Sequence, residues 1–249
     1  IGLVLTMGNL HDGHLSLIRE AQLHNEFVIC SIFINPTQFN NENDFNSYPK
    51  TIDEDISKLE NIGCNALFLP DIQEIYPKGL AKKKIVNNFR NILCDKFRPG
   101  HFDGVTTVVD LFFNMIKPTN SYFGEKDFQQ VKIIQDLVKI NHHNIKIIQC
   151  PSVRDKMGMS LSSRNSKFSN DQLKIFNVLG NKIKEHINLL TQNEINNLDQ
   201  LKIELLQNNI NKIDYLEIRN ENNLEITKNY SEARLFIALY IGDIRIIDN

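Results

Sequence analysis

The sequence predicts an α/β fold, in which a doubly wound parallel sheet is followed by a smaller C-terminal α+β domain. Three observations support this prediction. Before residue 151, short apolar segments alternate with longer segments of helical periodicity. The short segments are continuous apolar runs, which is typical of parallel strands that helices cover on both faces. After Pro151 the order changes to two helical segments followed by three strand-like ones, which favours a separate domain.

The elements of the first domain follow from these patterns in chain order. Apolar, largely β-branched runs predict strands at residues 2–6, 27–35, 66–69, 121–123 and 145–150. Apolar residues three and four positions apart predict helices between them, at residues 14–24, 51–61, 104–116 and 126–140. Proline follows the third strand, the third helix and the fifth strand, where it stops each element. Such a sheet is Rossmann-like, and its ligands bind beyond the carboxyl ends of the strands.

The second domain begins with a polar, serine-rich loop that follows Pro151. Its elements are predicted as helices at residues 171–190 and 198–206 and as antiparallel strands at 213–219, 234–241 and 244–247. We place the boundary near residue 152, which gives two domains, 1–152 and 153–249. The asparagines between residues 187 and 229 alternate with periodic Leu and Ile, so we interpret them as solvated positions rather than as disorder.

Composition and charge exclude several classes of function. The chain has 249 residues, with 28 Lys and Arg against 30 Asp and Glu, so it is not a polycationic nucleic-acid binder. Its apolar runs are far shorter than the about 18–20 residues that span a bilayer. Four cysteines without Cys-x-x-Cys spacing predict buried thiols in a reducing cytoplasm. The start lacks a signal-peptide pattern, and because it falls within an apolar run, we expect further residues upstream.

Two histidines, His11 and His14, lie at the turn from the first strand to the first helix, within TMGNLHDGH at residues 6–14. Gly8 and Gly13 permit close backbone approach, and a helix N-terminus offers N–H groups to an anion. We interpret the turn as a phosphate site for a nucleotide, with a helix cap bearing incidental histidines as the alternative. Zinc is disfavoured, because His-x-x-His suits one helix face poorly and the sequence places no third ligand. The Walker loop is absent, which excludes P-loop chemistry.

Two further segments offer polar groups to a small substrate. FINPTQF, residues 33–39, follows the second strand and presents Asn35 and Gln38, although Asn-Pro after a strand is commonly only a turn. RPGHFDG precedes an apolar helix. Its Arg98 and His101 could bind a carboxylate or a phosphate, whereas Asp103 is predicted to cap the helix.

Charged residues also mark the end of the fourth strand. FGEKDFQQ, residues 123–130, places Lys126 between Glu125 and Asp127 at a strand-to-helix turn. Lys126 could bind ATP phosphates, and the two carboxylates could serve Mg²⁺, a ribose or the structure alone. A second acidic cluster, residues 53–55, could also reach Mg²⁺, but we predict a solvated helix start there.

The second domain opens with MSLSSRN at residues 159–165. Hydroxyl groups beside Arg164 suit a flexible clamp for an anion. The alternative is a serine-rich linker that happens to contain an arginine.

Taken together, the five segments resemble the pantothenate synthetase family, the ATP-dependent pantoate–β-alanine ligases. TMGNLHDGH is similar to the family's His-x-Gly-His nucleotide motif, and FINPTQF, RPGHFDG, FGEKDFQQ and LSSRN match its other blocks in order and spacing. LSSRN is also similar to the KMSKS loop of the wider class I synthetase and nucleotidyltransferase superfamily. The resemblance runs from residue 2 to the end of the chain. It departs at Leu5, where the family usually has Pro, and at residues 157–160, where it usually has Asp-Gly-Leu-Ala.

The resemblance implies a ligation in two steps. The pantoate carboxylate attacks ATP to give pantoyl adenylate and pyrophosphate, and β-alanine then displaces AMP to give pantothenate. ATP is thus a co-substrate, and Mg²⁺ is the implied metal, with ligands that the sequence does not identify. The implied catalytic residues are His14, His11 and Lys126, with His14 also a proton donor. The chain would act in the cytoplasm as a homodimer, without nucleic acid or membrane as a partner.

The resemblance also implies ligand contacts residue by residue. Pantoate would be held by Gln38 and Gln130, with Gln38 also near β-alanine and Asn35 a further member of the pocket. The loop at residues 153–165 would close over the phosphates and exclude water. The ATP contacts implied in domain 1–152, the nucleotide- and pantoate-binding domain, are Met7, Gly8, Asn9, Leu10, His11, Asp12, Gly13, His14, Gly124, Glu125, Lys126 and Asp127. Those implied in domain 153–249 are Val153, through its backbone, and Leu161, Ser162, Ser163 and Arg164.

Two other functions stay open at this point. A nucleotidyltransferase of the same superfamily would keep the nucleotide in its product and would not need FINPTQF and RPGHFDG. A catalytically inactive nucleotide-binding module would bind ATP without releasing pyrophosphate. The intact His-x-Gly-His motif, Lys126 and Arg164 argue against the inactive module.

Overall fold

The computed structural model describes residues 1–79, 83–142, 144–191 and 197–249. The chain divides into two compact units, Ile1–Ser152 and Val153–Asn249, each of which is described by itself.

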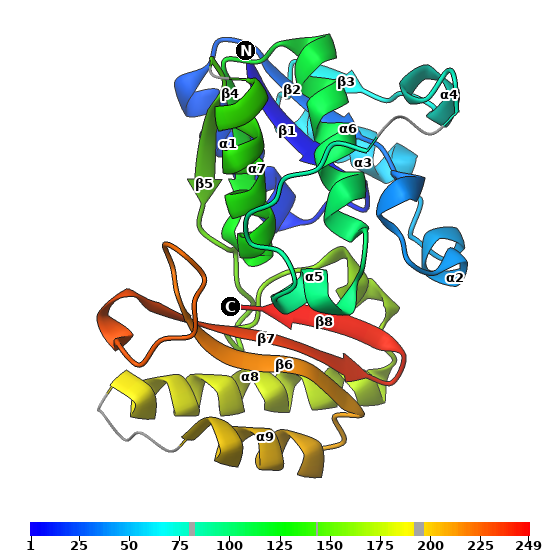
Figure 1. The fold of residues 1–249 in the computed structure, drawn as a ribbon. Coiled ribbons are helices and arrows are strands. Elements are labelled where there is room, and N and C mark those ends of the chain that lie inside the picture. The colour runs from blue at the N-terminus through cyan, green and yellow to red at the C-terminus, as the bar shows by residue number, and fades with distance from the viewer. Residues whose placement is uncertain (80–82, 143, 192–196) are drawn as a thin grey trace. The chain divides into compact units, whose positions relative to one another are not determined.

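Unit 1 is built on a parallel sheet with strand order β3-β2-β1-β4-β5 (Figure 1). From β1 the chain runs outward to β2 and β3, returns to β4 beside β1, and continues to β5. The strand order therefore reverses between β1 and β4, which is where open α/β sheets bind ligands. The strands are β1 Gly2–Thr6, β2 Val28–Ile32, β3 Ala66–Phe68, β4 Asn120–Gly124 and β5 Lys146–Cys150.

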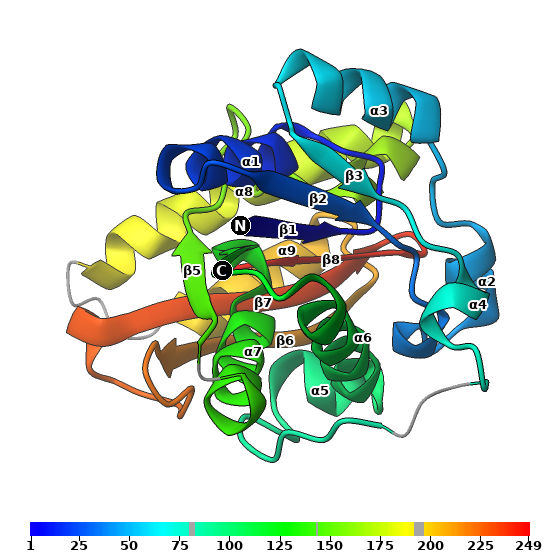
Figure 2. The ribbon, with the colours of Figure 1, turned by 90° about the horizontal axis from the view of Figure 1, so that it is seen from above.

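Helices cover both faces of this sheet, with α1 and α3 on one face and α6 and α7 on the other (Figure 2). The α-helices of unit 1 are α1 Asp12–His24, α2 Glu42–Asn46, α3 Ile52–Asn61, α4 Ile72–Ile75, α5 Leu93–Phe97, α6 His101–Ile116 and α7 Phe128–Asn141. Short 3₁₀ turns follow β2 and β4, at Pro36–Gln38 and Glu125–Asp127.

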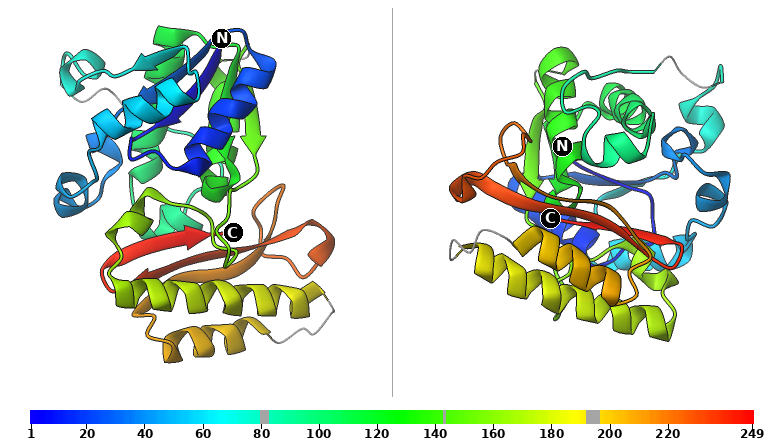
Figure 3. Two further views of the ribbon diagram at one scale, coloured as in Figure 1. Left: turned by 180° about the vertical axis from the view of Figure 1, so that it is seen from behind. Right: turned by 60° about the horizontal axis from the view of Figure 1, so that its bottom comes forward.

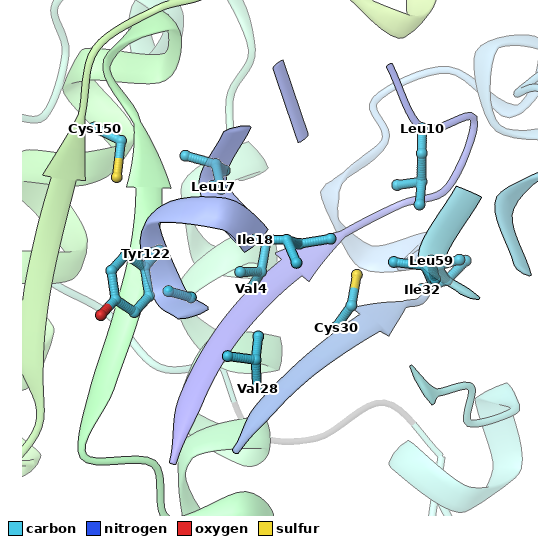
Figure 4. Packing of buried hydrophobic residues seen from close by; sticks show 11 residues of the cluster. Val4, Leu10, Leu17, Ile18, Val28, Cys30, Ile32, Leu59, Tyr122 and Cys150 are labelled. Atoms are coloured by element: carbon cyan, nitrogen blue, oxygen red, sulfur yellow. The ribbon is translucent and has the colours of Figure 1, made fainter. Parts of the chain in front are cut away.

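The core on the α1 side joins the sheet to α1 and α3 (Figure 4). Val4, Ile18 and Cys30 have no exposed surface. Leu10, which follows β1, is only 2% exposed and lies in the same cluster as Leu59 of α3. Burying a leucine side chain stabilises a fold by about 1.5–3 kcal/mol. Leu10 therefore anchors the start of the β1–α1 connection in the core.

Unit 2 consists of an antiparallel three-stranded sheet, in the order β6-β7-β8, packed against two helices (Figure 3). Its helices are α8 Asn170–Thr191 and α9 Asn197–Gln207, preceded by a 3₁₀ turn at Ser163–Lys167. Its strands are β6 Lys212–Asn220, β7 Ala233–Ile241 and β8 Ile244–Asp248, with a 3₁₀ turn at Tyr230–Glu232. Leu201 and Leu239 have no exposed surface and belong to one apolar cluster between helices and sheet.

The predicted fold class is confirmed: a parallel sheet flanked by helices and a small antiparallel sheet with two helices. Each predicted strand and helix is present, with ends shifted by a few residues. The short helices α2, α4 and α5 were not predicted, because four or five residues show no helical period. In the described part of the chain, no helix has the length and apolarity that a membrane span needs.

The prediction that Asp103 caps a helix starting at residue 104 is wrong. Helix α6 begins at His101, and its N-cap is Gly100 with a left-handed φ of +80°. Asp103 therefore lies inside the first turn, where its Oδ1 accepts a hydrogen bond from Arg90 Nη1 at 2.8 Å. A glycine cap offers no side-chain oxygen, so the sequence carries no capping signal at position 100.

All four cysteines are free thiols, as predicted. Cys30, Cys94 and Cys150 are buried, and Cys64 is half-buried. Burial raises the pKa of Cys150 to about 11 and also raises the pKa of Cys64. The thiols of these two residues are therefore protonated at neutral pH and poor nucleophiles.

Candidate active site

The turn that leaves β1 adopts a backbone that few residues can form. Gly8 has φ +82° and Asn9 has φ +50°, both in the left-handed region. A side chain on Gly8 would press on Asp55 Oδ2 and on Ile32 Cγ2, each 3.1 Å from an ideal Cβ. Glycine at position 8 is thus required by conformation and by space.

Asp55 of α3 holds this turn in place. Its Oδ2 accepts a hydrogen bond from Asn9 N at 2.8 Å, and its Oδ1 accepts one from Leu10 N at 2.7 Å. Thr51 Oγ1 donates to the same carboxylate at 3.2 Å. Asp55 is 1% exposed, so these charge-assisted bonds are shielded from water. The sequence did not predict that Asp55 supports this turn.

The prediction of a solvated acidic helix start is therefore right for two residues and wrong for the third. Asp53 and Glu54 are exposed, whereas Asp55 points inward. The signal was present in the sequence, because Asp55 lies three residues after Ile52 and four before Leu59. All three lie on the buried side of α3.

His11 and His14 together cap the N-terminus of α1. His11 is the N-cap, and its Nδ1 accepts a hydrogen bond from Gly13 N at 3.1 Å. His14 Nδ1 accepts one from His11 N at 3.4 Å, and the two rings lie 4.0 Å apart between centroids. Since each Nδ1 accepts, each neutral ring carries its proton on Nε2. Among the residues that the structure describes, neither Nε2 has a hydrogen-bond partner.

Both imidazoles are uncharged at neutral pH. Burial lowers the pKa of His11 to about 4, helped by the nearby ammonium of Lys126. Burial also lowers the pKa of His14 well below its ordinary value, with smaller effects from His11 and Lys126. The capping interpretation and the phosphate interpretation are therefore compatible, because Nδ1 caps the helix while each Nε2–H stays available as a neutral donor.

Lys126 reaches this turn from β4, the neighbouring strand. It lies in the 3₁₀ turn after β4, with Nζ 3.7 Å from Asp127 Oδ2. Its positive charge helps to lower the pKa of both histidines. Glu125 Oε1 accepts a hydrogen bond from Gln149 Nε2 at 2.8 Å. The switch point of the sheet thus gathers two neutral donors and an ammonium group.

Gly124 differs from Gly8 in what its surroundings require. Its φ is −76°, which any residue can adopt, and no heavy atom lies within 4 Å of an ideal Cβ. The fold of unit 1 therefore does not explain a glycine there. The end of β4 is therefore open beside Gly124 within the part of the chain that the structure describes.

Asn35 is predicted to contact substrate, but its amide is fully engaged inside the protein. It is 1% exposed and donates to Gly104 O at 3.1 Å and to Gln38 Oε1 at 3.3 Å. Its Oδ1 accepts from Tyr76 OH at 2.8 Å and from the Thr37 hydroxyl at 3.0 Å. This arrangement makes Asn35 a residue that orients Gln38.

Gln38 in turn touches the β1 turn, since its Nε2 lies 2.8 Å from Met7 Sδ. The other predicted substrate residue, Gln130, is half-buried in the first turn of α7. Its side-chain amide makes no hydrogen bond to another residue in the described ranges. Its neighbour Gln129 is buried instead and donates to Phe89 O and Ile92 O at 2.8 and 3.0 Å.

Arg98 and His101 face the backbone of Gln38. His101 Nδ1 lies 2.7 Å from Gln38 O, and Arg98 Nη2 donates to the same oxygen at 3.3 Å. Arg98 Nη1 also lies 3.2 Å from His101 Nε2. Gly104 lets α6 approach closely, because a Cβ there would overlap the carbonyl oxygen of Thr37. The loop before α6 therefore packs against the loop after β2. Arg98 and His101 both contact the carbonyl oxygen of Gln38.

In unit 2, the loop at residues 153–165, which is predicted to bind phosphate, is held by several hydrogen bonds within the unit. Leu161 N donates to Val153 O at 2.9 Å, and Arg154 Nη1 binds both carboxylate oxygens of Asp248 at 3.0 and 3.1 Å. Ser162 Oγ accepts from Arg164 N at 3.3 Å and caps the 3₁₀ turn, while Ser163 is buried.

Residues 157–160, which depart from the family pattern, belong to this hydrogen-bonded loop. Asp155 Oδ1 accepts hydrogen bonds from Met157 N and Met159 N at 2.9 and 3.0 Å. The Met159 side chain is buried in the core of unit 2. Gly180 of α8 provides the room, since a Cβ there would lie 2.7 Å from Met157 O. The departure from the family pattern is thus accommodated by packing.

A resident metal centre does not emerge from these side chains. Across residues 1–79, 83–142, 144–191 and 197–249, no group of three or more His, Cys, Asp or Glu could hold a metal ion. Asp55, the member of the acidic cluster closest to the turn, is occupied by backbone N–H groups.

Comparison with known proteins gives one family. The model of the pantoate-beta-alanine ligase family matches residues 1–249. A pantothenate synthetase of Thermodesulfovibrio yellowstonii is 41% identical over 255 residues, covering 100% of this chain and 90% of that protein. A pantothenate synthetase of Francisella tularensis subsp. novicida is 43% identical over 250 residues, covering 100% of this chain and 88% of that protein.

Two solved structures are similar over almost the whole chain. Pantothenate synthetase from Thermus thermophilus superimposes with a TM-score of 0.93 at 34% identity, covering 99% of this chain and 91% of that one. Pantoate-beta-alanine ligase from Francisella tularensis, complexed with beta-gamma ATP and beta-alanine, gives a TM-score of 0.87 at 40% identity. That match covers 99% of this chain and 87% of the other.

Proposed function

Because this chain belongs to the pantoate–β-alanine ligase family, we propose that it is the enzyme that joins pantoate to β-alanine at the expense of ATP. Pantoyl adenylate is the intermediate, and pantothenate, AMP and pyrophosphate are the products. The observation that carries this proposal is the pair of neutral imidazoles of His11 and His14, whose Nδ1 atoms are engaged by backbone N–H groups and whose pKa values are influenced by Lys126. The beta-gamma ATP and beta-alanine with which the Francisella relative is complexed support the choice of substrates.

The chemistry requires activation of a carboxylate, which is a poor acylating agent. In the first step a pantoate carboxylate oxygen bonds to the α-phosphorus of ATP, and the bond from that phosphorus to the pyrophosphate oxygen breaks. In the second step the β-alanine amine bonds to the acyl carbon, AMP leaves, and the amine loses a proton. Negative charge builds on the phosphoryl oxygens during the first step, so donors fixed there beforehand lower the barrier.

His11 and His14 supply such donors. Each imidazole is neutral, and each Nδ1 is held by a backbone N–H, so Nε2–H faces a phosphate without prior reorganisation. Pyrophosphate leaves as an anion, so the step needs no proton from the enzyme. We therefore propose His14 as a hydrogen-bond donor to the phosphates, in place of the proton donor expected from the resemblance. Lys126 adds a full positive charge.

Pantoate is proposed to bind Gln38 and Gln130, with β-alanine also near Gln38. Asn35, Arg98 and His101 hold Gln38 from behind rather than touching substrate. ATP is proposed to contact the turns after β1 and β4 in unit 1. For unit 2, the resemblance is the basis for proposing the backbone of Val153 and the hydroxyls and arginine of the LSSR segment as ATP contacts, in a loop that closes over the phosphates.

Mg²⁺ is proposed to arrive on the phosphates of ATP. This ion commonly takes its ligands from substrate oxygens and water rather than from a cage of protein groups. It would neutralise phosphate charge, and no side chain of this chain is assigned to it. The homodimer and the cytoplasmic location remain predictions from the resemblance.

Pyrophosphate exchange into ATP tests the proposal directly. With pantoate and Mg²⁺ present and β-alanine left out, we expect labelled pyrophosphate to enter ATP, and only when pantoate is present. Adding β-alanine should then release AMP and pantothenate in equal amounts. A product that retains the nucleotide would favour the nucleotidyltransferase alternative. ATP binding without exchange for any acid would contradict the proposal in favour of an inactive module.

A further inference from the structure

Lys58 of α3 also reaches the turn after β1. Its Nζ donates a hydrogen bond to Leu10 O at 2.8 Å, and its side chain is half-buried. Asp55, one helical turn earlier, binds Asn9 N and Leu10 N. Helix α3 therefore meets the backbone of the turn at three points, with one carboxylate and one ammonium group.

These two charges differ in how they are satisfied. The Asp55 carboxylate accepts from two backbone N–H groups and from the Thr51 hydroxyl. Lys58 forms no ion pair with any carboxylate that the structure describes, and Leu10 O engages one of its three N–H bonds. Lys126, by comparison, lies 3.7 Å from Asp127. The ammonium group of Lys58 therefore keeps N–H bonds that could be donated to an anion.

The charge of Lys58 acts on the two histidines that follow Leu10. It contributes to the lowered pKa of both His11 and His14, as the charge of Lys126 does. Two ammonium groups, from α3 and from the end of β4, thus act on the same pair of neutral donors. A single phosphate at a helix N-terminus does not require two cations, whereas a polyphosphate carries charge enough for both.

We propose that Lys58 is a second phosphate-binding cation of this site and contacts the polyphosphate of the nucleotide, and the pyrophosphate product, together with Lys126. The proposal rests on the proposed use of ATP at this turn. The hydrogen bond to Leu10 O holds the ammonium group in position before the anion binds, so little side-chain entropy is lost. A lysine in a charged helix is usually a solvated residue, which is why no sequence signal marks Lys58.

Binding measurements on Lys58→Gln separate a charge contact from a structural clamp. Glutamine keeps a neutral N–H donor but removes the charge. We expect the Kd for ATP and for inorganic pyrophosphate to rise about tenfold, as for the loss of one charge-assisted contact. Adenosine, which has no phosphate, should bind within about twofold of wild type. Lys58→Arg should restore ATP and pyrophosphate binding.

The matched control is Lys50→Gln, which removes one positive charge from an exposed lysine just before α3. It should leave all three affinities unchanged. Equal weakening of adenosine and ATP in Lys58→Gln, or unchanged binding of ATP and pyrophosphate, would overturn the proposal. Wild-type protein that binds pyrophosphate but lacks pantoate-dependent exchange would contradict the proposed function while leaving the Lys58 comparison decisive. Wild-type protein that binds neither ATP nor pyrophosphate would overturn both.

Discussion

Two histidine-bearing loops of unit 1 use their imidazole nitrogens in different ways. In the turn after β1, His11 and His14 direct Nδ1 to backbone N–H groups and keep Nε2 outside the internal network. In the loop before α6, His101 directs Nδ1 to Gln38 O and Nε2 to Arg98. Both loops combine histidine with a nearby cation, yet the first engages only Nδ1 of each ring in hydrogen bonds to other described residues, whereas the second engages both ring nitrogens of His101. This difference in partners is the basis on which we propose a binding role for His11 and His14 and a positioning role for His101.

The sharpest test of this contrast is His14→Ala. Losing one fixed donor to a transition-state charge lowers kcat by about a hundredfold to a thousandfold. Losing a helix cap costs only about 1 kcal/mol of folding free energy, so the variant should stay folded. The measurement is the rate of pantoate-dependent pyrophosphate exchange alongside a thermal melt. A rate near that of wild type would contradict the assignment of His14 to the phosphates.

Asp55→Asn should give the next largest effect. Asparagine has one acceptor oxygen where the carboxylate has two, so its NH₂ group would face the backbone N–H of Asn9 or of Leu10. We expect a loss of about 2–3 kcal/mol in urea unfolding, because a charge-assisted buried contact is broken. The KM for ATP should rise about tenfold as the turn loosens. Exposed Asp53→Asn is the matched control, and an equal loss there would refute the clamp.

His101→Ala should act on one substrate only. Removing its imidazole leaves Gln38 O with Arg98 alone, and the Gln38 side chain loses its fixed orientation. The KM for pantoate should rise about threefold to tenfold, while the KM for ATP stays constant. Steady-state kinetics with each substrate varied in turn decide this. A change confined to the KM for ATP would place His101 with the phosphates instead.

The smallest expected effect concerns pH. His11 has a pKa of about 4 when folded and about 6.5 when unfolded, so the unfolded state binds more protons between these values. The free energy of unfolding should therefore fall as pH is lowered from about 6.5 toward 4, and His11→Asn should reduce that slope. His11 should contribute no step to the exchange rate between pH 6 and 8. A rate change of His11 origin in that range would contradict a neutral imidazole.

The sequence predicted the sheet and its covering helices because continuous apolar runs and helical spacing are local signals. It predicted the histidine turn and Lys126 for a similar reason, since both follow strands that the pattern identifies. It did not reveal Asp55 or Lys58, whose partners Asn9 N, Leu10 N and Leu10 O lie more than 40 positions away. Charged residues in a helix look solvated until tertiary structure supplies their partners.

Asn35 is a residue whose sequence position suggested a ligand contact, although its partners in the folded protein were not predictable. An amide just after a strand has the chemistry of a substrate ligand. Only the fold reveals that Tyr76, Thr37 and Gly104 already engage it. Helix α6 likewise starts earlier than predicted, because Gly100 in the left-handed region is its N-cap. Asp103 therefore lies within the helix and forms an ion pair with Arg90.

The pairing of β1 with β4 also bears on how the enzyme is synthesised. Ser121 Oγ donates to Leu3 O across 118 positions of sequence, so the strand that brings Lys126 leaves the ribosome long after His11 and His14. A nascent chain therefore displays the histidines without the ammonium group that completes their site. Long-range closure of this kind is slow relative to local folding. The arrangement of Lys126 beside the two histidines therefore exists only after β4 has joined the sheet.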